Sequence, residues 1–177
     1  LTMQILGRGS SRSGSEDQMY ALVSGNQDLY KQISPTVTMM GAVKIGSDSI
    51  STSSVTGVSE DYMDAKRQKL AAGRNLTYID IKENNKVCVV GAYYAYLYDD
   101  DIVGNYIKIN GDKYTVVGVV EETDDRTDED GSDNFVYVPY STASKFLAFN
   151  ANISSYIFLS ASEDNVDACV NLIEDRL

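Results

Sequence analysis

The sequence contains no histidine, two cysteines, two prolines and no apolar run near 18 residues in length. Without histidine, a Ser-His-Asp or Cys-His catalytic arrangement within the chain is excluded, and zinc loses its commonest nitrogen ligand. Cys88 and Cys169 are too few for a four-cysteine zinc site. Without a long apolar run, no membrane span is expected inside the chain. These absences exclude histidine-based catalysis and a four-cysteine zinc site, and no catalytic, cofactor-binding or metal-binding residue is singled out by the sequence.

Basic residues are also scarce, because 15 Lys and Arg stand against 26 Asp and Glu, for a net charge of −11. A phosphate backbone needs a basic face, so nucleic acid is not expected as a partner, and direct docking on anionic headgroups is disfavoured. No nucleotide-binding glycine motif occurs, since GRGSSR at 7–12 departs at its last position. Acids are too abundant for any pair to be singled out, so a hydrolase that uses two carboxylates stays open.

The pattern of apolar residues predicts alternating strands and short helices. Pro35 is expected to close the first region, and a helix capped by Ser59 is expected within 59–73. The predicted strands are 1–6, 36–45, 49–58, 86–91, 104–120 as a hairpin, 135–140 and 153–161. Four other helices are predicted. The first begins at Ser15 with the capping box SEDQ, the second spans 92–98, and the third begins at Ser141. The last follows Ser162 and carries an apolar stripe of Val166, Cys169, Val170, Ile173 and Leu177.

The segment 104–120, GNYIKINGDKYTVVGVV, contains the strongest turn signal. Asn110 and Gly111 both tolerate positive φ, which favours a tight hairpin. Gly118 stands inside the second strand. A glycine at such a position marks a bulge or a close approach by another backbone, and we expect one of these rather than ligand binding.

The segment 121–133, EETDDRTDEDGSD, holds eight acids and one arginine. It offers almost no apolar area to offset the cost of ordering, so we expect it to be mobile, exposed and dispensable for folding. An EF-hand loop does not fit, because placing Gly131 sixth puts Arg126 first and Tyr137 twelfth. An irregular calcium site remains an alternative. Both cysteines are expected to be buried small hydrophobes, with a Cys88–Cys169 disulfide as the alternative.

Five segments occur in a fixed order: VTGVSEDYM, LAAGR, VCVVG, DDDIVGNYIKINGDKYTVVGVV and FVYVPY. Together they resemble the extracytoplasmic core domain of MacB-type ABC transporter permeases. The departures are Asn105 for a usual lysine, Asp101 for a frequent proline, and Val138-Pro139 for Ile-Pro. The resemblance implies that Gly73, Arg74, Gly91 and Gly104 hold turns. For Arg74, a guanidinium that binds loop carbonyls or a nearby carboxylate is expected.

The resemblance implies an α+β fold with two lobes. A porter-like α/β lobe would be built from both chain ends, 1–54 and 134–177, and a mostly β lobe, 55–133, would be inserted between them. The domain would lie outside the cell membrane, between the first and second membrane helices of a permease. An apolar helix of ~20 residues is then expected before Leu1 and another after Leu177.

The function implied is non-catalytic: coupling cytoplasmic ATP hydrolysis to export or to a mechanical signal outside the membrane. The expected partners are the permease's own transmembrane helices, a cytoplasmic ATPase subunit and a second permease copy, with an adaptor protein or an exported peptide or lipid as further candidates. The isolated domain is expected to be monomeric or weakly dimeric. Two alternatives stay open: a permease domain that regulates cell-wall hydrolases, and a secreted ligand- or calcium-binding module.

Overall fold

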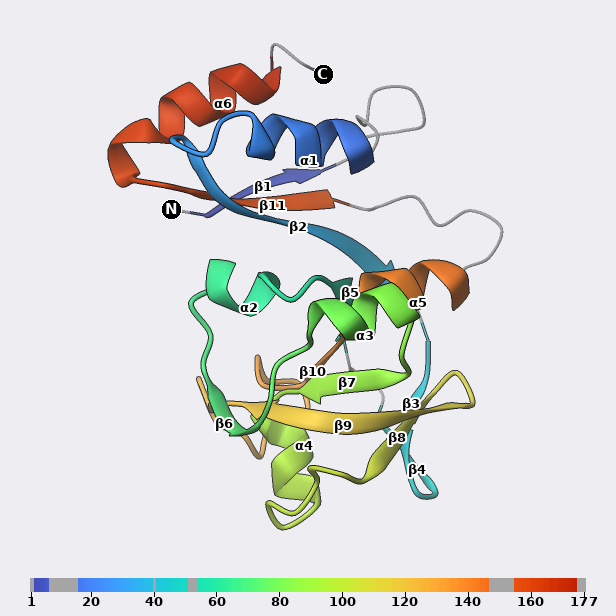
Figure 1. The fold of residues 1–177 in the computed structure, drawn as a ribbon. Coiled ribbons are helices and arrows are strands. Elements are labelled where there is room, and N and C mark those ends of the chain that lie inside the picture. The colour runs from blue at the N-terminus through green and yellow to red at the C-terminus, as the bar shows by residue number, and fades with distance from the viewer. Residues whose placement is uncertain (1, 7–15, 40, 51–53, 147–154, 175–177) are drawn as a thin grey trace.

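The structure is a computed structural model of the 177-residue chain, and it describes residues 2–6, 16–39, 41–50, 54–146 and 155–174 (Figure 1). The strands are β1 (Thr2–Leu6), β2 (Tyr30–Met39), β3 (Val43–Ile45), β4 (Asp48–Ile50), β5 (Ser54–Val58), β6 (Leu70–Gly73), β7 (Val87–Val90), β8 (Tyr106–Ile109), β9 (Asp112–Val120), β10 (Phe135–Pro139) and β11 (Ser155–Ser160). The helices are α1 (Glu16–Ser24), α2 (Tyr62–Ala65), α3 (Tyr78–Glu83), α4 (Ala92–Leu97), α5 (Tyr140–Phe146) and α6 (Val166–Glu174), with a 3-10 turn η1 (Glu163–Asn165) before α6. The fold is α+β, as the sequence predicts.

The described strands form one mixed sheet in the order β1-β11-β2-β5-β10-β7-β9-β8-β3-β4, with β6 paired to β9 beside this path. Most neighbours are antiparallel, while β10 runs parallel to β5 and β7 runs parallel to β9. β2 is central to the order because it pairs with two different strands along its length. Residues 30–36 pair with β11, and residues 37–39 pair with β5.

The first and last elements of the chain lie together at one end of the molecule. β1 and β11 pair antiparallel, β11 pairs with the first part of β2, and α1 and α6 cover one face of these three strands (Figure 1). The apolar cluster between them includes Met19, Leu22, Tyr30, Phe158 and Ile173. Burial of these side chains supplies the main driving force for this layer.

The larger part of the molecule is a strongly curved sheet of the remaining strands. α4 and the turn after it lie at the end opposite β1 and α6 (Figure 1). The cluster enclosed here includes Val37, Met39, Val55, Tyr94 and Ile107. A third cluster joins the two layers, because Ile157 of β11 packs with Val58, Tyr62 and Tyr137. No helix among the described residues has the length and apolar content to cross a bilayer.

The predicted hairpin is confirmed. β8 and β9 pair antiparallel with Ile109 opposite Asp112, and Asn110 and Gly111 have φ of 52° and 91°. Gly118 combines the two features that were expected as alternatives. The pairing of β9 with β7 skips Val117, which marks a bulge. A Cβ placed at Gly118 would also overlap the carbonyl oxygen of Arg74, because β6 crosses closely at Gly73.

Several expected boundaries are wrong. Pro35 does not end the first region but lies inside β2 opposite Tyr156. Proline lacks an N–H donor, but its carbonyl oxygen can still accept a hydrogen bond. The stretch 59–73 contains only the four-residue α2 and then strand β6, and α3 follows it. α2 begins after Asp61 rather than Ser59, and α5 begins at Tyr140, so Ser141 is not its cap. The capping box at Ser15 lies outside the described residues.

In the last helix Cys169 and Ile173 are buried as predicted, but Val170 is 37% exposed. Val170 follows Cys169 by about 100° around the helix, so it lies at the edge of the buried face. The predicted lobe division, 1–54 with 134–177 and 55–133, stays a prediction. Val37, Ile50 and Val136, which belong to the first predicted lobe, pack in one apolar cluster with residues of the second predicted lobe, 55–133.

We predict that Gly118→Ala lowers the free energy of unfolding by about 2 kcal/mol or more, because the new methyl group must displace the Arg74 carbonyl. Chemical denaturation monitored by circular dichroism measures the change. Thr115→Ala, at an exposed position of the same strand, is the control and should cost under about 1 kcal/mol. Equal losses for the two variants would contradict the close crossing.

Candidate functional site

The turn between β6 and α3 is organised around one buried carboxylate, Asp80. The Nη1 atom of Arg74 donates to Asp80 Oδ2 at 2.7 Å and to the carbonyl oxygen of Asn75 at 2.9 Å. Thr77 donates to Asp80 Oδ2 from its backbone N–H and its hydroxyl, and the Asn85 amide donates to Oδ1. The predicted role of Arg74, binding a loop carbonyl and a nearby carboxylate, is confirmed.

These contacts determine the charge state of Asp80. Burial alone would raise its pKa, but the hydrogen bonds from Arg74, Thr77 and Asn85 outweigh burial and hold the pKa well below its usual range. Thr77 and Asp80 also form a reciprocal capping box at the start of α3. The carboxylate therefore stabilises the turn as an ion, and its full set of partners leaves it poorly suited to accept a proton from a substrate.

The same network presents two apolar side chains to solvent. Tyr78 and Ile79, the first residues of α3, are 63% and 65% exposed. Other large exposed side chains include Tyr96 and Leu97 on α4, near the end of the molecule opposite β1. Exposed aromatic and aliphatic residues on short, well-held elements suit contact with another protein.

The acidic segment 121–133 is anchored at its end. Asp133 is fully buried and accepts hydrogen bonds from Thr123 N, Thr123 Oγ1 and Asp124 N. Its carbonyl oxygen lies so close to Gly91 that no Cβ would fit there. Most of the segment is exposed as predicted, but the expectation is wrong for Asp133, whose carboxylate closes the base of the loop.

An ion pair joins the acidic segment to the turn after α4. Arg126 makes a bidentate ion pair with Asp100, with an Nη1–Oδ1 distance of 2.6 Å. Asp99 and Asp100 both have positive φ, which is costly for residues with a side chain. Within the described residues, no group of three or more acid or cysteine side chains is arranged to hold a metal ion.

A shallow cavity of about 490 Å³ lies beside the base of the acidic segment. Phe135 and Tyr137 of β10 form its floor with rings stacked 4.6 Å apart, and Tyr62 of α2 meets Tyr137 edge-on at 5.0 Å. The Tyr137 hydroxyl donates to Gln68 Oε1 at 3.1 Å. Burial raises the pKa of both tyrosines above the usual range, so both phenols stay protonated. This cavity is the strongest candidate for a ligand site among the described residues.

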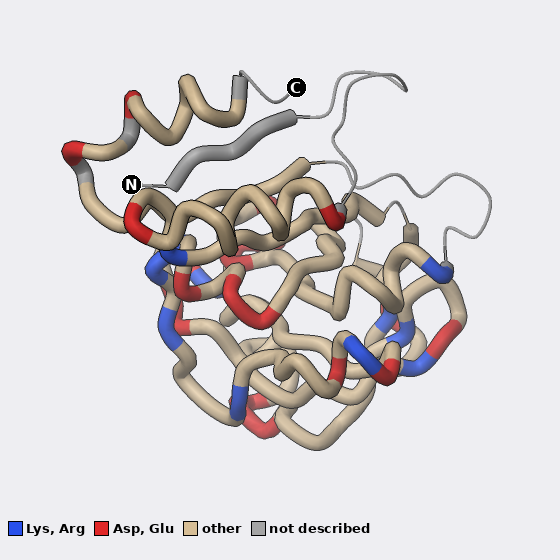
Figure 2. The backbone as a smooth tube through the Cα atoms, turned by 45° about the horizontal axis from the view of Figure 1, so that its top comes forward, with Lys and Arg blue, Asp and Glu red and all other residues tan. Residues whose placement is uncertain are grey.

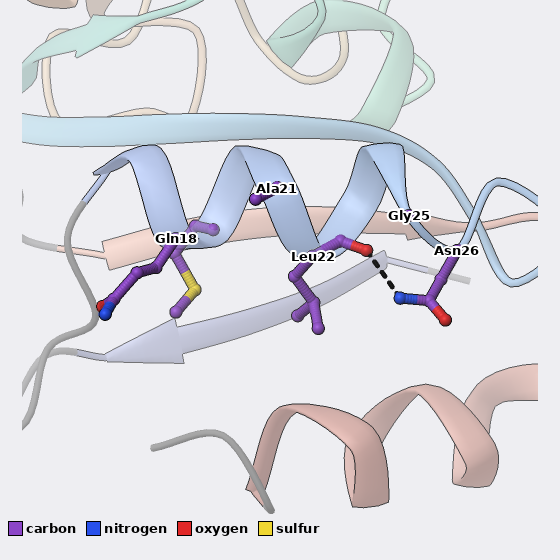
Figure 3. Close-up of a pocket in the computed structure, with 6 residues that line it drawn as sticks. Gln18, Ala21, Leu22, Gly25 and Asn26 are labelled. Carbon is purple, nitrogen blue, oxygen red and sulfur yellow. Dashed lines mark hydrogen bonds between the residues drawn. The ribbon is translucent and has the colours of Figure 1, made fainter.

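Another cavity, of about 450 Å³, lies along α1 (Figure 3). Figure 3 shows Leu22 pointing from α1 toward the side on which β1 and α6 are drawn, and Asn26 donating to the Leu22 carbonyl oxygen at 2.8 Å. The described lining comes from α1 and the turn that follows it. Polar groups from separate elements do not converge there, so it is a weaker candidate.

The cysteines do not form a site. Cys88 lies in the larger cluster and Cys169 in the cluster under α1, and both are free and buried. The alternative of a disulfide between them is therefore wrong. Burial raises the pKa of both thiols, which makes them unreactive.

The family model for the MacB-like periplasmic core domain matches residues 1–176. The chain belongs to this family. The MacB macrolide export ATP-binding/permease protein of Aggregatibacter actinomycetemcomitans is 28% identical over 140 residues, which is 78% of this chain and 21% of that protein. The corresponding MacB of Hahella chejuensis is 32% identical over 108 residues, 58% of this chain and 16% of that protein. The chain thus spans about a fifth of the length of these relatives.

Solved structures of MacB-like domains have the same fold. The periplasmic region of MacB from Actinobacillus actinomycetemcomitans matches 98% of this chain and 81% of that chain, with a TM-score of 0.75 and 22% identity. The extracellular domain of the transporter YknZ from Gram-positive bacteria matches 90% of this chain and 82% of that one, with a TM-score of 0.71 and 18% identity. These structures share the fold, and the family model assigns the chain to the MacB-like periplasmic core domains, as its sequence motifs indicate.

The MacB-like motifs mark turns. They do not predict the cavity lined by Phe135, Tyr137 and Tyr62. The sequence predicts a strand for FVYVPY, and the alternation of Phe135 and Tyr137 with the buried valines is the signal in it for a second, aromatic face. No local pattern places Tyr62 beside them, because that contact depends on the packing of α2 against β2 and β11.

We predict that Asp80→Asn lowers the free energy of unfolding by about 2 kcal/mol at neutral pH, since an amide pairs poorly with Arg74 and Thr77. Because the pKa of Asp80 is lowered on folding, its stabilisation is present above the unfolded-state pKa of about 3.9 and is lost as pH falls through the folded-state pKa. The difference between wild type and variant should therefore shrink below about pH 4. Denaturation across pH measures it.

Glu83→Gln, an exposed position on the same helix, is the control for Asp80→Asn and should stay within about 0.5 kcal/mol at every pH. A wild-type-to-Asp80→Asn difference that stays constant down to about pH 2 would show that the carboxylate's ionisation does not stabilise the turn.

For the acidic segment we predict that Asp133→Ala lowers the free energy of unfolding by about 2 kcal/mol, because two backbone N–H groups lose their acceptor. Replacing 124–131 by a short Gly-Ser link, with Thr123 and Asp133 kept, should change it by under about 1 kcal/mol. Thermal melts compare both variants with Asp130→Ala, an exposed position. A greater loss from the shortened loop than from Asp133→Ala would reverse this assignment.

Proposed function

We propose that this domain transmits movement from the membrane-spanning part of its permease to partners outside the membrane, without catalysing a reaction. The observation that carries the proposal is the double pairing of β2. One strand joins the layer that holds the chain's first and last elements to the larger curved sheet. A displacement of β1 and α6 therefore reaches the opposite end through continuous backbone hydrogen bonds.

Buried polar contacts hold the two layers together beside β2. Ser34 is fully buried, and its hydroxyl oxygen accepts from Ser59 N at 3.1 Å. Beside it, within the terminal layer, the Thr36 hydroxyl donates to the Ser155 carbonyl oxygen at 3.1 Å and fixes β11 to β2 where the pairing with β5 begins. The cluster around Ile157 and Tyr62 fills the remaining space. Such a junction resists hinge bending, because bending would expose polar groups that lose their partners.

The partners follow from the family and the geometry. The names of the relatives combine ATP-binding and permease functions, so we assign the energy source to a cytoplasmic ATPase and the direct mechanical input to the permease's own transmembrane helices. A second permease copy would stand beside this one, and an adaptor protein or an exported peptide or lipid would meet the far end, where Tyr96 and Leu97 are exposed. The proposed lobes are 1–54 with 134–177 and 55–133.

The test uses the full-length permease with its ATPase in lipid nanodiscs. A spin label at Asn105→Cys, in the exposed turn after α4, reports the distance between the two copies. Cys88 and Cys169 are buried, so within this domain the label goes to the introduced thiol, and any cysteine outside the domain is replaced by serine beforehand. We expect the label-to-label distance to differ between the nucleotide-free and ATP-bound states. ATP hydrolysis without any such change would refute the proposal.

Ser34→Ala then tests the junction. It leaves Ser59 N–H without its acceptor, at a cost of roughly 1–3 kcal/mol, and should broaden the distance distribution or reduce the ATP-dependent change. Lys31→Ala, an exposed position on the same strand, is the matched control and should behave as wild type. If both variants respond alike, the junction at Ser34 does not carry the movement.

A further inference from the structure

The cavity beside the acidic segment is built from four parts of the chain. Ser54 and Thr56 of β5 lie opposite Phe135 and Tyr137 of β10 in the parallel register, so all four belong to one sheet face. Tyr62 and Gln68 come from α2 and the turn after it, and Thr123, Ser132 and Asn134 come from the acidic segment and its end. Hydrogen-bonding groups from separate elements therefore converge over an aromatic floor.

The aromatic floor is fixed in place. Tyr137 is held by its hydroxyl bond to Gln68, by the stack with Phe135 and by the edge contact with Tyr62. Phe135 is half-buried, so part of its ring remains accessible, whereas Tyr62 and Tyr137 are buried. A prepositioned ring loses little side-chain entropy when a ligand packs on it.

The lining is uncharged, although 23% of the chain is charged. Its side chains are hydroxyls, amides and aromatic rings. Charges of opposite sign lie near it: Thr123 and Ser132 of the lining belong to the acidic segment, and the Lys66 ammonium lies 5.9 Å from the centre of the Tyr62 ring. An anion would meet the acidic segment, and a cation would meet the Lys66 ammonium. A purely apolar ligand would cover the hydroxyls of Ser54 and Thr56 without offering them a hydrogen bond.

We propose that this cavity is a binding site for a neutral saccharide. A pyranose ring has an apolar face of C–H groups. The partly positive hydrogens of that face can pack on the electron-rich face of the Phe135 ring. Its hydroxyls both donate and accept, which matches the hydroxyls of Ser54 and Thr56 and the Gln68 side chain, whose Oε1 atom accepts from Tyr137. A volume of about 490 Å³ accommodates one or two sugar rings. The inference does not rest on the coupling role, and either can fail without the other.

The test measures binding of chitotetraose and of maltotetraose, two neutral probes of different ring substitution, to the 177-residue chain by ¹⁵N-resolved NMR titration. At least one should bind with a Kd of about 1 mM or below and shift amide signals of β10 and of 123–134. Phe135→Leu keeps an apolar side chain but removes the aromatic face, and should weaken binding about fivefold or more. Thr56→Val keeps the shape but removes the hydroxyl, and should weaken it about fivefold.

Thr115→Val, an exposed position of β9 outside the cavity, is the matched control and should bind as wild type. Melting curves of every variant confirm that each is folded at the titration temperature. The proposal is overturned if neither saccharide shifts these signals at roughly tenfold the expected Kd. It is also overturned if a charged probe of similar size, such as tetralysine or tetraglutamate, binds the cavity more tightly, or if Phe135→Leu and Thr56→Val bind as tightly as Thr115→Val.

Discussion

The shared pairing of β2 is the constraint on which the rest of the molecule depends. Every buried backbone N–H and C=O needs a partner, and β2 meets this need with β11 along residues 30–36 and with β5 along residues 37–39. The change of partner places its two halves in two different apolar clusters, represented by Tyr30 and Val37. Because the strand is covalently continuous through this change, the two layers cannot rotate freely about each other.

The edge of the curved sheet depends on a second constraint, the close crossing of β6 and β9. The absence of side chains at Gly73 and Gly118 lets the two backbones approach, and the chain then turns at Arg74. The guanidinium reaches back to Asp80, whose carboxylate in turn fixes the start of α3. The position of the Arg74–Asp80 ion pair thus depends on the close backbone contact between β6 and β9. The glycine sets where Arg74 lies, and Arg74 keeps Asp80 ionised in a buried position.

The sequence predicted those parts of the fold that local chemistry determines. Asn110-Gly111 fixed the hairpin because positive φ is a local requirement, and the bulge at Gly118 followed from the missing side chain. The region 59–83 was not predictable in the same way. Tyr62 and Met63 form a helix of one turn because they pack in the third cluster, not because the sequence favours a long helix. Asp133 looked like one acid among eight, and only its position beside Thr123 distinguishes it.

The distribution of charge bears on how such a domain stands relative to a membrane. In the layer formed by the first and last elements, α1 and α6 contain acids but no Lys or Arg, β1 and β11 contain no charged residue, and Lys31 of β2 is the basic residue within its described strands and helices. Figure 2 shows other basic residues on the flanks of the larger curved sheet. An anionic headgroup surface repels acidic elements within a Debye length of about 8 Å. In the permease we propose, α1 and α6 are therefore not the elements that adsorb to an anionic lipid surface. Elements that do not adhere to lipid remain free to follow the membrane helices, which is the mechanical condition that transmission through β2 requires.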